Sequence, residues 1–348
     1  MKKICKLVTK VLIILLFVCI ICYSLATFTE CPILSDMRTI WIETAMSTAD
    51  HQWLATKFFP KYVVDEVMSK RIDRYVEIGI TSSEDFLVNE NEEIANDEKV
   101  DNQIFSDTDD FGNKVITNNI EQGIKIVEVK TNTYTGKLVF IDDPSRVYVG
   151  HTQKKGVMGK LILDYLKDEE CIVGINANGF SDPNGQGKGG DIIGYSISNG
   201  EVWGSGDFSY YTTIGFDENN RLIVGQLNEY KKYNLRDAVQ YMPALIVDGK
   251  ILTKCTAGWG MQPRTVVAQR ADGVVMFLVV DGRKPGYSIG ITMQEAAELL
   301  LDYGAVTAGA CDGGSSSVLA YDGKIINKPS TPMVTGRYLP NAFLVKKK

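Results

Sequence analysis

The residue types best suited to chemistry lie in one short stretch, Cys311-Asp312-Gly313-Gly314-Ser315-Ser316-Ser317, directly after the apolar run 305–310. Consecutive glycines allow backbone N–H groups to converge into an anion-binding nest, and the serine hydroxyls add further donors. An aspartate at the end of a buried strand, beside such a nest, is well placed to act on a sugar phosphate. The stretch therefore predicts a functional loop, and a plain turn is the alternative.

Two other stretches place polar side chains at the ends of predicted strands. Asn176 and Asn178 are two residues apart, so at strand spacing their carboxamides point to the same face. Arg264 opens one predicted strand and Asp281 closes the next, which would put a cation and a carboxylate at strand ends. The alternatives are an Asx-rich turn for the asparagines, and a solvated arginine and a turn aspartate for the other pair.

The elements that must position these residues are mostly strands. Asp248-Gly249, Asp272-Gly273 and Asp322-Gly323 each separate apolar runs, which is a strong hairpin signal. Helices are expected at 156–166 and 292–303. Runs of strands with few helices predict an α+β fold, with a mixed, β-rich domain over residues 124–348. The expected strands are 124–130, 136–141, 146–150, 171–176, 244–247, 264–269, 274–280, 305–310 and 342–345.

Glu295 stands three residues after Thr292, at the start of the second expected helix. This spacing fits a capping box, in which the two side chains satisfy each other's backbone N–H groups. Capping is therefore its default role, and a catalytic role needs a separate argument.

The first thirty residues carry a membrane signal. Lysines at positions 2, 3, 6 and 10 precede an uncharged apolar run over residues 11–28. Eighteen helical residues rise roughly 27 Å, which is enough to cross a hydrocarbon core. The positive-inside rule puts the N-terminus in the cytoplasm and the remaining chain outside. Residues 1–30 are thus expected to be a cytoplasmic basic end and a single-pass membrane anchor; a signal peptide cleaved near Ser24 and Ala26 is the alternative.

Two regions separate this anchor from the β-rich domain. Residues 31–80 show apolar positions at three- and four-residue spacing and predict a helical membrane-proximal region. Residues 81–123 include an acid-rich part that is poor in aromatics, and they predict a flexible linker.

The composition argues against several classes of protein. The net charge is -6 and no dense Lys/Arg stripe is present, so a nucleic-acid partner is not expected. His51 and His151 are the only histidines and the sequence has no CxxC pair, which disfavours a zinc site. The sequence requires no cofactor.

The order of these motifs resembles the phosphodiester glycosidase family, which includes the lysosomal uncovering enzyme and bacterial exopolysaccharide-related proteins. The similarity runs over 147–345 and is strongest over 264–317. One motif departs from the family pattern: it reads Asn176-Ala177-Asn178-Gly179-Phe180, so Asn176 is the alternative equivalent of the family asparagine. The resemblance places ten residues at family motif positions: Asn178, Arg264, Asp281, Glu295, Asp312, Gly313, Gly314, Ser315, Ser316 and Arg337.

The resemblance implies hydrolysis of the glycosidic C–O bond of a sugar-1-phosphodiester, in a cell-surface glycopolymer or exopolysaccharide. Asp312 is then expected at the anomeric carbon, with Arg264 and the N–H groups of Gly313 and Gly314 on the phosphate. Asp281 or Glu295 would supply a second carboxyl, and the two asparagines would bind sugar hydroxyls.

Three points stay open at this stage, and one is a phosphodiesterase that cuts the P–O bond instead of the C–O bond. A divalent cation bridging Asp312 and the phosphate is compatible with these ligand types. A non-catalytic module that binds a cell-surface glycopolymer would use the same anion nest and arginine, and it is the alternative function.

Overall fold

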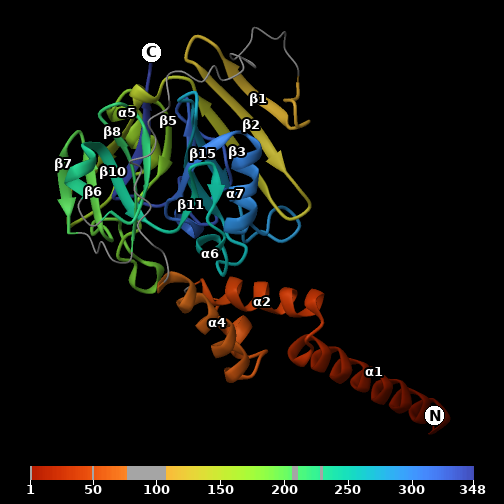
Figure 1. Cartoon of the computed structure of the whole chain (residues 1–348). Coiled ribbons are helices and arrows are strands. Elements are labelled where there is room, and N and C mark those ends of the chain that lie inside the picture. Colours follow the sequence, from red (N-terminus) through yellow and green to blue (C-terminus); the bar gives the residue numbers. More distant parts are fainter. Residues whose placement is uncertain (1, 49–50, 77–106, 206–210, 228–229) are drawn as a thin grey trace. The chain divides into compact units, whose positions relative to one another are not determined.

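A computed structural model describes residues 2–48, 51–76, 107–205, 211–227 and 230–348. The chain forms two compact units (Figure 1). The first comprises Met1–Asp73 with Gly258–Gly260, and the second comprises Arg74–Ala257 with Met261–Lys348.

The first unit is helical, as expected for the region that follows the apolar run. Its helices are α1 (Lys2–Phe28), α2 (Pro32–Met46), α3 (Trp53–Thr56) and α4 (Lys61–Val76). Proline stands at the first position of α2 and directly before α4, where its missing N–H costs no helical hydrogen bond. Ile42 and Ala45 of α2 pack against Ala55 of α3 and three buried valines of α4.

Helix α1 is long and apolar enough to cross a membrane over Thr9–Phe28, and it is the one helix of this kind among the described residues. A signal sequence has the same length and composition. The structure therefore supports a membrane-directing N-terminus without giving its sidedness.

The second unit is built from three antiparallel sheets, and the expected α+β, β-rich class is confirmed. An eight-stranded sheet has the order β1-β2-β3-β14-β13-β15-β11-β12, and two five-stranded sheets have the orders β7-β6-β10-β8-β9 and β17-β16-β5-β18-β4. The strands are β1 (Lys114–Asn119), β2 (Ile124–Lys130), β3 (Thr135–Ile141), β4 (Val147–His151), β5 (Cys171–Asn176), β6 (Tyr195–Ser198), β7 (Glu201–Gly204), β8 (Thr212–Asp217), β9 (Leu222–Gly225), β10 (Leu235–Tyr241), β11 (Ala244–Val247), β12 (Lys250–Ile251), β13 (Arg264–Arg270), β14 (Val275–Val280), β15 (Ala305–Ala310), β16 (Leu319–Tyr321), β17 (Lys324–Ile325) and β18 (Asn341–Lys346).

One hydrophobic core joins the three sheets. Phe343 of β18 packs edge-on against Phe216 of β8 and at a tilt against Phe277 of β14, with ring centroids 6.3 and 6.2 Å apart. Each of these rings comes from a different sheet. The α-helices described in this unit are α5 (Ile162–Asp168), α6 (Thr253–Thr256) and α7 (Met293–Asp302), and α7 packs on β15 and β11.

The expected hairpins are present. Asp248 and Gly249 connect β11 to β12, and Asp322 and Gly323 connect β16 to β17, with positive φ at all four residues. These are the two-residue turns whose twist matches that of the flanking strands.

Several strand ends differ from the predictions by one residue, and three features differ by more. The sheet begins at β1 rather than at residue 124, because β1 completes an antiparallel ladder with β2; most of the expected linker, residues 81–106, lies outside the described residues. Helix α5, expected over 156–166, begins at Ile162, because Gly156 has φ +77° and Lys160 pairs with Leu339 in a β-bridge. The sheet formed by β6–β10 was not predicted.

Candidate active site

The backbone of Asp312, two residues beyond β15, is held from two sides. Its N–H donates to Ala177 O at 2.9 Å, and the N–H of Cys311 donates to Thr265 O at 2.9 Å. The side chain of Asn176 donates to Asp312 O at 2.6 Å. Asp312 is therefore fixed between the end of β5 and the start of β13.

The Asp312 carboxyl points into the protein and accepts several hydrogen bonds, although the residue as a whole is half-buried. The Ser316 hydroxyl, the Tyr241 phenol and the Gly313 N–H all donate to it. Burial raises the pKa of Asp312, while these donors and the positive charge of Arg337 act in the opposite direction. Burial and the adjacent carboxylate raise the pKa of Tyr241 well above its usual range, so the phenol keeps its proton and remains a donor.

The two glycines after Asp312 do not form the expected anion nest. Gly314 has φ +61° and donates its N–H to Pro263 O at 2.9 Å, and the Gly313 N–H is used by the Asp312 carboxyl. These glycines instead provide space, because a Cβ at Gly313 would lie 2.8 Å from Pro263 O. Both N–H groups have acceptors inside the protein in this structure, and their binding of phosphate stays a prediction.

Positive charge at this loop comes from guanidinium groups. A Cβ placed on Gly313 would lie 3.7 Å from Nη1 of Arg264, a buried residue at the start of β13. A Cβ on Gly314 would lie 2.9 Å from Nη2 of Arg283, whose Nε donates to Gln262 Oε1 at 2.9 Å. Two arginines thus border the two glycines.

Arg337 adds a third guanidinium beside the same loop. Its Nη1 donates to Ser315 Oγ at 3.2 Å, and Asp182 accepts from Nη1 at 2.5 Å and from Nη2 at 2.8 Å. The guanidinium carbon lies 4.7 Å from the centroid of the Phe180 ring. The bidentate pair and the ring hold this guanidinium in one orientation, and the pairing lowers the pKa of Asp182.

The two asparagines expected to bind sugar are used inside the protein. Both are buried, and Asn176 Oδ1 accepts from Thr265 Oγ1 at 2.8 Å and from Val318 N at 3.1 Å. Asn178 Nδ2 lies within 3.1 Å of the carbonyl oxygens of Ile193, Tyr195 and Gln240. Asn178 also forms a reciprocal pair with Asn341. These contacts give both asparagines a structural role, and sugar binding by them stays a prediction.

The Asp281 carboxyl also supports the loops around it. Oδ1 accepts from Asn327 Nδ2 at 3.0 Å and from Lys328 N at 2.9 Å, and Oδ2 accepts from Tyr287 OH at 2.9 Å. Asn327 Nδ2 also lies 3.3 Å from Ser317 O, which links Asp281 to the Asp312 loop through one side chain. Burial raises the pKa of Asp281 against these donors.

Glu295 forms the expected capping box of α7. Its Oε2 accepts from Thr292 N at 2.9 Å and from Thr292 Oγ1 at 2.8 Å, while Glu295 N donates to Thr292 Oγ1 at 3.1 Å. The default role predicted from the sequence is confirmed.

Three residues of the site were missed by sequence reasoning. Tyr241 ends β10, Asp182 follows the asparagine motif, and Arg283 follows Asp281 by two residues with φ +59°. Arg283 stands in the Val279–Arg283 stretch that drew attention to Asp281, so its motif gave a signal. No local pattern marks the phenol of Tyr241, because its partner is 71 positions away at Asp312.

Among the residues that the structure describes, no group of three or more His, Cys, Asp or Glu side chains is gathered to hold a metal ion. The divalent cation considered from the sequence remains a prediction.

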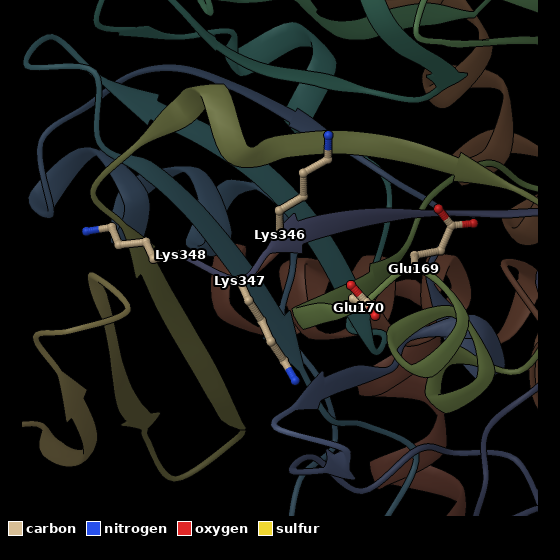
Figure 2. A pocket seen from close by; sticks show the side chains of 5 residues that line it. All are labelled: Glu169, Glu170, Lys346, Lys347 and Lys348. Carbon is tan, nitrogen blue, oxygen red and sulfur yellow. The ribbon is translucent and has the colours of Figure 1, made fainter.

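A separate pocket of about 440 Å³ lies at the end of β18, where Lys346, Lys347 and Lys348 meet Glu169 and Glu170 (Figure 2). Glu169 accepts from Tyr148 OH at 3.2 Å, and Lys346 Nζ lies 5.0 Å from the Tyr148 ring centroid. Its lining includes no residue of the Asp312 loop. We place the candidate active site at that loop because a carboxyl and three guanidinium groups lie together there.

Comparisons with known proteins concern the family and the fold of this chain. Residues 169–346, half of the chain, match the family model for phosphodiester glycosidases. The catalytic domain of a zebrafish N-acetylglucosamine-1-phosphodiester alpha-N-acetylglucosaminidase, auto-inhibited by its pro-peptide, has a TM-score of 0.54 and 19% identity over 65% of this chain and 82% of that one. A hypothetical protein from Synechocystis has a TM-score of 0.53 and 15% identity over 64% of this chain and 62% of that one.

A curated relative is the uncharacterized SPbeta prophage-derived protein YomE of Bacillus subtilis (strain 168), at 27% identity over 295 residues. The match covers 79% of this chain and 44% of YomE, so the chain spans less than half of that relative's length.

In fold, the β-rich unit resembles the catalytic domain of a glycosidase. The chain belongs to the phosphodiester glycosidase family.

Proposed function

We propose that this protein hydrolyses the glycosidic C–O bond of a sugar-1-phosphodiester. The observation that carries the proposal is the Asp312 carboxyl, set in a loop that three guanidinium groups border at Gly313, Gly314 and Ser315. A carboxylate beside concentrated positive charge suits a substrate whose sugar carbon becomes cationic while its phosphate leaves as an anion.

Asp312 stabilises the anomeric carbon in this mechanism. Glycosidic cleavage passes through an oxocarbenium-like transition state, which a facing carboxylate stabilises. The donors from Ser316, Tyr241 and Gly313 favour the ionised carboxyl that this role needs.

The arginines stabilise the leaving group. A phosphate leaves as a weak base, so it needs charge stabilisation more than a strong proton donor. Arg264 and Arg283 lie nearest the two glycines, and Arg337 orients Ser315. Asp281 and Glu295, considered earlier as a second carboxyl, are left out of this mechanism because their oxygens are held by neighbouring donors.

We place the substrate in a cell-surface glycopolymer or exopolysaccharide, and we treat α1 as a single-pass anchor with the catalytic domain outside the cell. The support is the lysine-rich end of an apolar helix that is long enough to span a bilayer. Added protease should then degrade the C-terminal domain of intact protoplasts. Full protection of that domain would place it on the cytoplasmic side.

Asp312→Asn in the full chain, purified in detergent, tests the reaction. The wild type should release free sugar from UDP-N-acetylglucosamine or another sugar-1-phosphodiester. The variant should retain its thermal unfolding transition and lose about 10²–10⁴-fold in kcat. Hydrolysis in ¹⁸O-labelled water should place the label on the sugar, because C–O cleavage adds water at the anomeric carbon.

A glycopolymer-binding module without catalysis is the second candidate, since three guanidinium groups at one loop would also bind a polyanion. In that case the wild type would bind the polymer without turnover, and Asp312→Asn would bind equally well. A fully active Asp312→Asn enzyme would instead remove Asp312 from the mechanism.

A further inference from the structure

The ends of α1 and α2 are joined in a defined corner. Three residues, 29–31, connect the two helices, and Arg38 Nη1 of α2 donates to Thr27 O and to Thr29 O, each at 3.0 Å. One guanidinium thereby satisfies carbonyl oxygens at the end of α1, which an isolated helix leaves without partners. The direction of α2 is therefore tied to that of α1.

Helix α2 has two apolar faces, and only one of them packs against the other helices of its unit. Ile42 and Ala45 fill the small core shared with α3 and α4. On another face, Ile33, Met37 and Trp41 recur every four residues and are 71%, 63% and 51% exposed. A helical protein normally turns such a stripe toward a partner.

Aromatic residues from the next segment extend this stripe. Trp53 and Phe58 are 47% and 49% exposed, and the Phe58 ring centroid lies 6.4 Å from those of both Trp41 and Trp53. Trp41 donates its indole N–H to Leu54 O at 3.0 Å. Covering the Trp41 ring with an apolar phase would therefore leave no unmet hydrogen bond.

We propose that this surface, made of Ile33, Met37, Trp41, Trp53 and Phe58 and here called the α2 patch, lies in the headgroup region of the membrane that α1 crosses. The inference rests on the proposed anchor. The patch begins five residues after Phe28, which ends the apolar span and is itself 51% exposed. Tryptophan and amphipathic helices prefer the membrane interface, where an apolar ring and a polar edge are both solvated.

Continuity with the span selects lipid as the occupant. A second protein surface would need to approach a patch that starts at the exit of a transmembrane helix, where headgroups already surround the chain. Arg38 ties α2 to the end of α1. Once α1 is inserted in the membrane, the α2 patch therefore stays close to the bilayer surface.

Depth-dependent quenching of tryptophan fluorescence tests the proposal on the full chain. The protein is reconstituted in phosphatidylcholine–phosphatidylglycerol vesicles that contain lipids brominated either near the headgroup or near the bilayer centre. The four tryptophans are at positions 41, 53, 203 and 259, so replacing three of them with Phe leaves one reporter. A protein that retains Trp41 should be quenched severalfold more by the shallow bromines than one that retains Trp203 of the sheet domain.

A further variant separates failure of the patch from failure of the anchor. Leu16→Trp, in a chain with all native tryptophans replaced, should be quenched most by the deep bromines if α1 spans the bilayer. Quenching at position 16 with none at Trp41 overturns the lipid contact while keeping the anchor. Absence of quenching at position 16 overturns both, and sugar release measured on the same vesicles tests the enzymatic proposal independently.

Two checks keep the result interpretable. A protein that retains only Trp53 should repeat the Trp41 result, which guards against misfolding of a single variant. If Trp41 is shielded from aqueous iodide as well as from both brominated lipids, a protein surface covers the patch and the proposal is wrong.

Discussion

At the scale of single residues, a hydrogen bond joins the Tyr241 phenol to the Asp312 carboxyl. Tyr241 belongs to the sheet formed by β6–β10, which was not predicted, whereas the Asp312 loop was predicted from the sequence. Burial raises the pKa of Asp312, and the hydrogen bond from the Tyr241 phenol lowers it. In Tyr241→Phe that donor is lost, so the pKa of Asp312 should rise. If the ionised carboxyl is the active form, the acidic limb of the kcat/KM profile should move to higher pH, and sugar release measured against pH detects this.

The ring of Tyr241 should keep its packing in this variant, because a Cβ placed on Gly179 would lie 2.6 Å from Tyr241 Cε2. An unchanged acidic limb together with unchanged thermal stability would show that the phenol does not control Asp312.

Variants of Arg264 test whether its guanidinium stabilises the negative charge of the leaving phosphate. Arg264→Ala should lower both kcat and kcat/KM by about 10²–10³-fold, as expected for loss of one electrostatic donor. Arg264→Lys should restore activity only partly, because a single ammonium cannot reproduce the planar fork of a guanidinium. Steady-state kinetics on a sugar-1-phosphodiester provide the measurement.

The matched control is Arg270→Ala, at the other end of the same strand. Arg270 pairs with Asp272 at 2.8 Å on the surface, so its loss should leave kinetics unchanged. Equal losses in the two alanine variants would indicate a general effect on β13.

Asn178 should contribute mainly to stability. Asn178→Ala removes an NH2 group that lies within hydrogen-bond distance of three carbonyl oxygens, and an oxygen that accepts from the Asn341 amide, all in the interior. Leaving such groups unsatisfied should reduce the free energy of unfolding by about 3 kcal/mol or more. Urea denaturation checks this value. Normal stability with a raised KM for sugar would restore the original sugar-binding assignment.

At the scale of elements, the contacts of Glu295 are those of the capping box that begins α7. Thr292→Ala should cost about 1 kcal/mol of unfolding free energy. Glu295→Gln keeps the reach of the capping side chain, so it should retain kcat and nearly all stability. A large loss of kcat in Glu295→Gln, with unchanged thermal unfolding, would show that Glu295 acts on substrate.

At the scale of the whole molecule, His151 joins two sheets. It belongs to β4, and its Nε2 lies 2.8 Å from Ser196 Oγ of β6 in another sheet. Burial and the nearby Lys155 lower the pKa of His151 from 6.5 to about 4, although Glu201 opposes this change.

The neutral imidazole of His151 therefore contributes stability above the unfolded pKa of 6.5, and this contribution should be lost as the pH falls toward 4. The free energy of unfolding, measured by urea titration, should fall over that interval more steeply in the wild type than in His151→Gln. Parallel pH profiles for the two proteins would show that His151 does not cause the loss.

The sequence by itself determined the features that depend on neighbours along the chain. Strand periodicity located β2, β5, β11 and β15 at their observed bounds, and the Asp-Gly pairs located three hairpins. The capping box and the membrane-length helix were also readable, because hydrogen bonds three residues apart and apolar length are local properties.

Only the tertiary structure decided which polar groups meet one another. The sheet formed by β6–β10 carries buried polar residues such as Asp237 and Gln240, which interrupt the apolar pattern of a buried strand. The expected nest and the expected sugar ligands had the right residue types, but their donors and acceptors are used by Pro263, Asn341 and distant carbonyl oxygens. Hydrogen-bond partners of this kind are set when the three sheets close on a common core, and that closure joins positions too far apart in sequence for any local pattern to specify.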